Sequence, residues 1–187
     1  MTVSRSIIPI VSVRRAVGAA LLCLAVACRA HAGLLAAGQS MPDFALQDHT
    51  GKVVRSSDLA GKTYLLWFYP KARTPGCTTE ARGLRDQYAA LEAAGVVVLG
   101  VSFDSPESNR AFVEAEALPF RLLSDTDREL AVSVGAADSK NAWFARRISY
   151  LVGPDGKVLR AYDNVDPSVH AGQVLADRAP RAETNAK

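Results

Sequence analysis

The residue in this sequence best suited to covalent chemistry is Cys77, which follows Pro75 and Gly76. Thr63 to Tyr69, before it, is a continuous apolar run that ends at Pro70, which is typical of a strand buried on both faces. The residues after Cys77 have the apolar spacing of a helix. Cys77 is therefore predicted to lie in the first helical turn, where unpaired backbone N–H groups and the helix dipole favour a thiolate nucleophile.

A single cysteine also has a simpler interpretation as an inert core thiol, because free cysteines are among the most buried residues. The position of Cys77 favours the reactive interpretation, since functional groups gather where a loop leads from a strand into a helix. The sequence has three cysteines, and the other two, Cys23 and Cys28, lie near the N-terminus. The rest of the chain therefore has no second cysteine for an internal disulfide, and position 80, where a Cys-x-x-Cys pair would end, is Glu.

Residues 1–32 have the features of an export signal. An Arg14-Arg15 pair precedes an apolar run from Ala16 to Ala27, which is shorter than the roughly 20 residues of a membrane span. Ala30-His31-Ala32 then provides a small-x-small cleavage site. We expect cleavage after Ala32, export to a bacterial periplasm and no stable membrane contact afterwards. A lipoprotein signal at Cys28 and a twin-arginine signal are the alternatives.

The formal net charge of +3 belongs to this leader. Four of the 22 basic residues and none of the 19 acidic residues lie in it, so the remainder has one more acidic than basic residue. This balance gives no indication of a nucleic-acid-binding surface. Outside the leader, His49 and His170 lack metal-ligand spacing and are interpreted as surface residues, so no metal site and no cofactor is predicted. The acidic pairs Asp125/Asp127 and Glu114/Glu116 are interpreted as solvated.

The remaining segments predict one α/β domain over residues 33–178, followed by a flexible tail at 179–187. Its central strands are expected to be parallel, with an antiparallel hairpin at one edge. The expected strands are Phe44–Leu46, Val53–Arg55, Thr63–Tyr69, Val96–Val101, Phe120–Leu123, Ile148–Val152 and Lys157–Tyr162. The expected helical segments are Ser56–Leu59, Thr74–Ala93, Ser105–Glu116, Arg128–Val134 and Val169–Ala176.

Pro70, Thr74 and Cys77 resemble the Pro-x-x-x-Thr-x-x-Cys signature of peroxiredoxins, the AhpC/TSA superfamily. The wider sequence is similar to the bacterioferritin comigratory protein or PrxQ branch, and this resemblance extends from about Met41 to Leu175. It includes the segments Phe68–Lys71, Thr74–Thr78, Gly100–Ser102, Leu118–Phe120, Leu123–Asp125 and Arg147–Val152.

The resemblance implies a thioredoxin-like fold with a central mixed sheet flanked by helices. It implies that Cys77 is the peroxidatic nucleophile, that the Thr74 hydroxyl lies beside the sulfur, and that Pro70 shields the site from water. Arg147 is expected to stabilise the negative charge that grows on the leaving oxygen. Arg146 is the competing candidate, because adjacent strand residues face opposite ways and only one of the two can point at Cys77.

The implied activity is a thiol-dependent reduction of hydrogen peroxide and organic hydroperoxides through a cysteine sulfenic acid. Many members of the branch have a resolving cysteine five residues after the first, where this chain has Arg82. The sequence therefore predicts a one-cysteine mechanism with an external thiol or a thioredoxin- or glutaredoxin-like reductant, in a monomer or weak homodimer. The alternatives are a non-enzymatic peroxide sensor or scavenger and a thioredoxin-like thiol-disulfide oxidoreductase.

Overall fold

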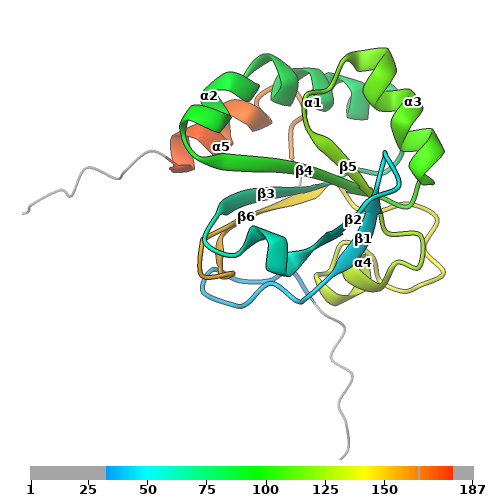
Figure 1. The fold of residues 1–187 in the computed structure, drawn as a ribbon. Helices are drawn as coiled ribbons and strands as arrows, with labels where there is room; N and C mark the ends of the chain where they lie inside the picture. The colour runs from blue at the N-terminus through cyan, green and yellow to red at the C-terminus, as the bar shows by residue number, and fades with distance from the viewer. Residues whose placement is uncertain (1–32, 164, 179–187) are drawn as a thin grey trace, which may run out of the picture.

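The computed structural model describes residues 33–163 and 165–178. The expected leader, including Cys23 and Cys28, and the expected tail at 179–187 lie outside the described residues. The described chain forms one seven-stranded mixed sheet in the order β2-β1-β5-β4-β3-β6-β7 (Figure 1). Its strands are β1 (Ala45–Asp48), β2 (Val53–Arg55), β3 (Thr63–Phe68), β4 (Val96–Ser102), β5 (Arg121–Ser124), β6 (Ile148–Val152) and β7 (Val158–Tyr162). Its helices are η1 (Ser56–Leu59), α1 (Pro75–Asp86), α2 (Tyr88–Ala93), α3 (Pro106–Glu116), α4 (Glu129–Ser133) and α5 (His170–Arg178).

The centre of the sheet is parallel and its two edges are antiparallel. Strand β4 pairs in parallel with β3 and β5, as predicted for strands that read as continuous apolar runs. Strand β6 pairs antiparallel with β3 and forms the expected edge hairpin with β7. A second hairpin, β1–β2, closes the other edge through β5. The predicted mixed sheet flanked by helices is confirmed.

The two faces of the sheet have separate cores because side chains alternate along each strand. In β3, Leu66 and Phe68 face the core beneath η1 and α4. Leu65 and Trp67 face the opposite core, which α1, α2, α3 and α5 cover (Figure 1). This second core contains Cys77, so the cysteine lies in the layer between the sheet and the larger group of helices.

One expectation about the helices needs correction. The predicted single helix from Thr74 to Ala93 is two helices, because the backbone leaves the helical region at Gln87 (φ −103°, ψ 8°). Leu84 before the break and Leu91 after it are both fully buried, so the break keeps both helices against the sheet. By contrast, α3 begins as predicted, with the Ser105 hydroxyl capping its first turn.

Asp125 is not the solvated charge that the sequence suggested. It is 1% exposed and accepts hydrogen bonds from the backbone N–H groups of Leu130 and Ala131, at 3.4 and 2.8 Å. Its carboxylate thus binds backbone N–H groups in the first turn of α4, which offsets the cost of burying the carboxylate.

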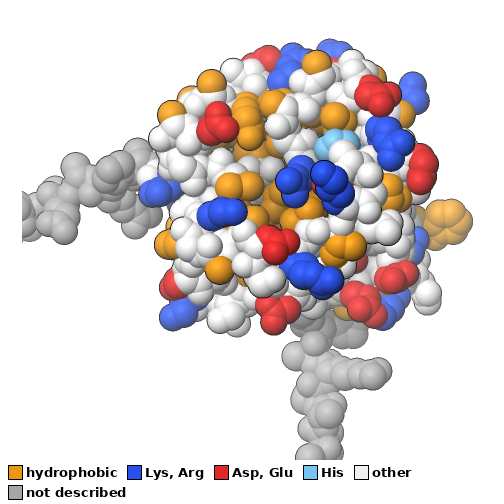
Figure 2. Space-filling model, viewed as in Figure 1, with side chains coloured by type: hydrophobic (Ala, Val, Ile, Leu, Met, Phe, Trp, Pro, Cys, Tyr) orange, Lys and Arg blue, Asp and Glu red, His pale blue; other side chains and the backbone are white. Residues whose placement is uncertain are grey.

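Acidic and basic side chains are interspersed over the face of the molecule shown in Figure 2. None of the helices within the described residues is long and apolar enough to span a bilayer.

Candidate active site

Cys77 is the third residue of α1, as the sequence predicted for the first helical turn. Thr74 is the N-cap residue, with an extended backbone, and Pro75 opens the helix. The cysteine is fully buried, and its Sγ accepts a hydrogen bond from Arg147 Nη2 at 3.4 Å. An inert core thiol has apolar neighbours on all sides, whereas this sulfur contacts a guanidinium. The site can therefore stabilise negative charge on the sulfur.

Arg147 reaches Cys77 because of how the sheet is paired. Phe68, at the end of β3, pairs with Ile148, the first residue of β6. Arg147 directly precedes β6, so it lies where the chain leaves β3 on its way to α1. Arg146 points elsewhere, with its Nη2 3.6 Å from Asp163 Oδ1. Of the two candidate arginines, the structure thus places Arg147 at the sulfur.

Glu80 is a member of this site that the sequence analysis missed. It lies three residues after Cys77 in α1, its side chain is 0% exposed, and its Oε2 forms an ion pair with Arg147 Nη1. Burial raises the pKa of Glu80, while the Trp67 indole and the Arg147 guanidinium favour its charged form. The available signal was position: residues three or four apart share a helix face, and an ionisable residue on the buried face needs a partner.

Neighbouring groups stabilise the positive charge of Arg147. Burial opposes this charge, but Glu80 and the cysteine outweigh the effect and raise the pKa of Arg147 above its ordinary value. One nitrogen of the guanidinium binds the carboxylate and another binds the sulfur. Because the fork is planar and rigid, fixing one side on Glu80 also aims the other side at Cys77.

Gly76 provides the space that the Arg147 guanidinium occupies. A Cβ atom at this position would lie 3.1 Å from Arg147 Nη2, which is closer than side chains normally approach. From the sequence, Gly76 was expected only to form part of the turn before the helix. The structure gives it a second role, because the absence of a side chain lets the guanidinium lie over the first turn of α1.

Asp104 holds the loop before α1 in place. Its Oδ2 accepts a hydrogen bond from the Ala72 N–H at 2.8 Å. Arg73 has a left-handed backbone (φ 63°), so the loop turns sharply before the helix. The Thr74 hydroxyl donates to the Lys71 carbonyl at 2.9 Å, and Pro70 is half-buried. These contacts fix the direction in which the chain enters α1.

Four half-buried residues lie in the loop before α1, in its first turn or beside it, and are called the rim here: Pro70, Thr74, Gly76 and Arg147. Cys77 itself has no exposed surface in this conformation. A peroxide therefore reaches Sγ only when this rim opens by a small movement.

Position 82, where many relatives were expected to have a resolving cysteine, is on the outer side of α1. Arg82 donates from its Nε to Glu116 Oε2 at 2.6 Å, tying α1 to the end of α3. Cys77 is the free cysteine within the described residues. In that part of the chain no group of three or more His, Cys, Asp or Glu side chains is arranged to hold a metal ion.

The interpretation of His170 as a surface residue is wrong. Its side chain is fully buried at the start of α5, because α5 packs this face against the sheet beside α1. Its Nε2 lies 3.0 Å from the Ser149 hydroxyl. His49 is half-buried, and its Nδ1 accepts a hydrogen bond from the Leu122 N–H at 3.3 Å.

Removing the Glu80 carboxylate is expected to destabilise the fold. Glu80→Ala should lower the free energy of unfolding by about 3 kcal/mol, because it leaves the mostly buried Arg147 guanidinium without its counter-ion. Urea titration of the two proteins would measure the difference. The matched control is Glu116→Ala, which removes a pair with the exposed Arg82 and should lower the stability much less. Equal losses in the two variants would contradict this account of the buried pair.

Comparisons with a family model, with a relative and with solved structures all point to one family. The family model described as the AhpC/TSA family matches residues 37–161. Peroxiredoxin Bcp of Escherichia coli (strain K12) is 42% identical over 146 residues, which cover 75% of this chain and 94% of that protein. The structure of Xanthomonas campestris peroxiredoxin Q is similar with a TM-score of 0.70 and 32% identity, covering 76% of this chain and 96% of that one.

A structure of Xanthomonas campestris bacterioferritin comigratory protein, described for its alkyl peroxide reduction activity, is similar with a TM-score of 0.71 and 31% identity. It covers 76% of this chain and 97% of the other. The likeness to these solved structures confirms the predicted thioredoxin-like fold.

Proposed function

The chain belongs to the AhpC/TSA family of peroxiredoxins, in the bacterioferritin comigratory protein or PrxQ branch, and on this basis we propose that it reduces peroxides by a one-cysteine mechanism at Cys77. The family establishes a thiol-dependent peroxidase. The observation that supports our assignment of the residues is the contact between Arg147 Nη2 and Cys77 Sγ at the first turn of α1.

In the first step, the Cys77 thiolate attacks one oxygen of the peroxide O–O bond. A sulfur–oxygen bond forms, the O–O bond breaks, and the leaving oxygen departs with the electron pair and takes a proton from water, giving an alcohol or water and Cys77 sulfenic acid. Negative charge moves from the sulfur to the leaving oxygen during this step. A fixed guanidinium beside the sulfur stabilises charge at both positions without having to reorganise.

Thr74 and Pro70 are proposed to shape the peroxide site. Thr74 lies at the N-cap of α1, one turn before the sulfur, where a hydroxyl could hold the peroxide oxygens. In the present conformation it donates to Lys71 O instead, so this role requires a rotation of its side chain when a peroxide binds. Pro70 lacks an N–H group and lies half-buried at the rim, which fits its proposed role in keeping water out.

The second step requires an external thiol, because no cysteine follows Cys77 in the sequence. A thiol attacks the sulfenic sulfur, water leaves and a mixed disulfide forms; a second thiol then releases Cys77 and leaves as a disulfide with the first. A small thiol or a thioredoxin- or glutaredoxin-like protein would supply these two equivalents. Hydrogen peroxide and organic hydroperoxides are the proposed substrates, the latter supported by the alkyl peroxide activity stated for the Xanthomonas campestris relative.

The proposal is tested by separating the two steps. Purified protein without reductant is mixed with hydrogen peroxide, a dimedone probe is added, and the products are mapped by mass spectrometry. We expect one sulfenic acid per chain, at Cys77, and no further peroxide consumption until a thiol is added. Catalytic consumption without any thiol would exclude the mechanism, and oxidation of Cys77 no faster than that of free cysteine would support the alternative of an inert thiol.

Export remains a proposal that rests on residues 1–32 alone. We propose that they are removed after Ala32 and that the protein acts in a bacterial periplasm. Mass spectrometry of the protein purified from its native cells would show a chain beginning at Gly33. A lipid-modified chain beginning at Cys28 would support the lipoprotein alternative instead.

A further inference from the structure

His170 lies in the same buried layer as the active site but takes no part in the proposed chemical steps. Its side chain is 0% exposed, and its ring is fixed from two directions. Nε2 lies 3.0 Å from the Ser149 hydroxyl, and Tyr162 packs edge-on against the ring with the centroids 5.1 Å apart. The imidazole therefore has one well-defined position between α5 and the sheet.

Ser149 connects this histidine to the catalytic strand. It is fully buried on β6, two residues after Arg147, and its hydroxyl contacts His170. Side chains alternate between the two faces along the strand. Leu151, two residues after Ser149, lies in the core that contains Cys77, whereas Ile148 faces the opposite core. Ser149 is thus the first side chain behind Arg147 on the face from which the guanidinium reaches the sulfur.

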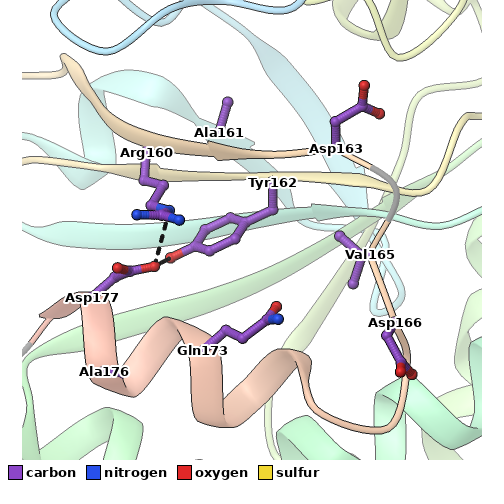
Figure 3. A pocket seen from close by; sticks show the side chains of 9 residues that line it. All are labelled: Arg160, Ala161, Tyr162, Asp163, Val165, Asp166, Gln173, Ala176 and Asp177. Atoms are coloured by element: carbon purple, nitrogen blue, oxygen red, sulfur yellow. Dashed lines mark hydrogen bonds and ion pairs between the residues drawn. The ribbon is translucent and has the colours of Figure 1, made fainter.

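The C-terminal end of α5 is tied to β7, and the Tyr162 ring links this end to His170 at the start of the helix. Tyr162 extends from β7 to α5, where its hydroxyl donates to Asp177 Oδ2 at 3.0 Å (Figure 3). Arg160 Nε lies 3.1 Å from the same carboxylate. These residues border a surface pocket of about 420 Å³ between β7 and α5 (Figure 3). Because their polar groups satisfy one another, these residues hold the end of α5 against β7.

Burying a histidine at this position costs free energy of folding. Its Nδ1 is buried and has no hydrogen-bond partner among the described residues. Burial, aided by the positive charge of Arg147, lowers the pKa of His170 to about 4, although the Gln173 side chain opposes this shift. The ring is therefore neutral at neutral pH, and Arg147 keeps its charge without a second cation beside it. An alanine at 149 and a leucine at 170 would fill the space without burying polar atoms, so packing alone does not explain the pair.

We propose that His170 is a positioning residue of the peroxidase reaction. Through its hydrogen bond to Ser149 it fixes the start of β6, and with it the adjoining Arg147 that reaches Cys77. This inference rests on the proposed function, because it assumes that Arg147 acts on the reacting sulfur. The histidine touches neither the sulfur nor the peroxide. It acts through the geometry of Arg147.

The test is a double-mutant cycle on the rate constant for oxidation of Cys77 by hydrogen peroxide, measured in a single turnover without reductant. His170→Leu is expected to lower this rate constant by roughly tenfold, because small displacements of a catalytic group reduce rates strongly. His170→Gln, which keeps a donor that can reach Ser149, should restore most of the loss. Ser149→Ala should reproduce the effect of His170→Leu and serves in its place if that variant does not fold.

The decisive comparison is made in the Arg147→Ala background. If His170 acts through Arg147, adding His170→Leu to Arg147→Ala lowers the rate constant no further. The same loss in both backgrounds, or none in folded His170→Leu and Ser149→Ala proteins, would overturn the proposal. His49→Leu, at a half-buried histidine away from this layer, should leave the rate constant unchanged. If Arg147→Ala itself oxidises at the wild-type rate, the assignment of Arg147 fails instead.

Discussion

Cys77→Ser is expected to abolish peroxide turnover. The serine hydroxyl is a far weaker acid than a thiol, so it supplies no anionic nucleophile at neutral pH. It also cannot form the sulfenic acid on which the second step depends. Consumption of hydrogen peroxide in the presence of dithiothreitol should therefore fall to the rate measured without protein.

The chain offers a matched control for this substitution. Cys23→Ser and Cys28→Ser, in the full-length protein, should leave peroxide turnover unchanged, because the mechanism uses neither thiol. Fold stability should change little in Cys77→Ser, since the hydroxyl can still accept a hydrogen bond from Arg147. Turnover that survives in folded Cys77→Ser protein would rule out Cys77 as the reacting group.

Arg147→Ala is expected to lower the rate constant for oxidation of Cys77 by about a hundred- to a thousand-fold. The substitution removes the cation that contacts the sulfur and leaves the helix N-terminus as the remaining source of positive potential. Stopped-flow measurement of a single turnover isolates this step from the action of the reductant. Arg147→Lys should recover only part of the loss, because an ammonium group cannot bind Glu80 and the sulfur with one rigid fork.

Two further variants distinguish the position of the charge from its presence. Arg146→Ala removes a neighbouring arginine that pairs with Asp163, and it should leave the rate constant within about twofold of wild type. Gly76→Ala keeps Arg147 but places a methyl group against its guanidinium, so its rate constant should be intermediate between wild type and Arg147→Ala. If Arg146→Ala and Arg147→Ala lowered the rate constant for oxidation of Cys77 equally, the net charge of the region, and not the position of the guanidinium, would explain the loss.

The outer side of α1 bears on how the sulfenic acid is reduced. Arg82 and Arg85 both bind Glu116, the first at its carboxylate and the second at its backbone carbonyl, at 2.6 and 2.8 Å. Together they attach the middle of α1 to the end of α3. Helix α1 contains no sulfur besides Cys77, since position 82 is Arg, and these contacts hold the helix at that position.

The amino-acid sequence was sufficient to predict a reacting cysteine at Cys77 and to predict the architecture around it. Cys77 stands out because a buried strand, a Pro-Gly turn and a helical pattern follow one another without interruption. These are local signals, since strand, turn and helix each depend on residues close in the chain. For the same reason the parallel β3–β4 pair and the Ser105 cap of α3 were predicted correctly.

Only the tertiary structure decided which residues face the sulfur. Whether Arg146 or Arg147 reaches Cys77 depends on the β3–β6 register, which joins residues about eighty positions apart. The roles of Glu80, Gly76 and His170 depend on the same long-range packing. From the sequence, Glu80 indicated only that no Cys-x-x-Cys pair is present, and His170 was interpreted as a surface residue. The role of a buried charge or imidazole depends on the partners that the fold brings next to it. Such partners leave no periodic signal in the sequence.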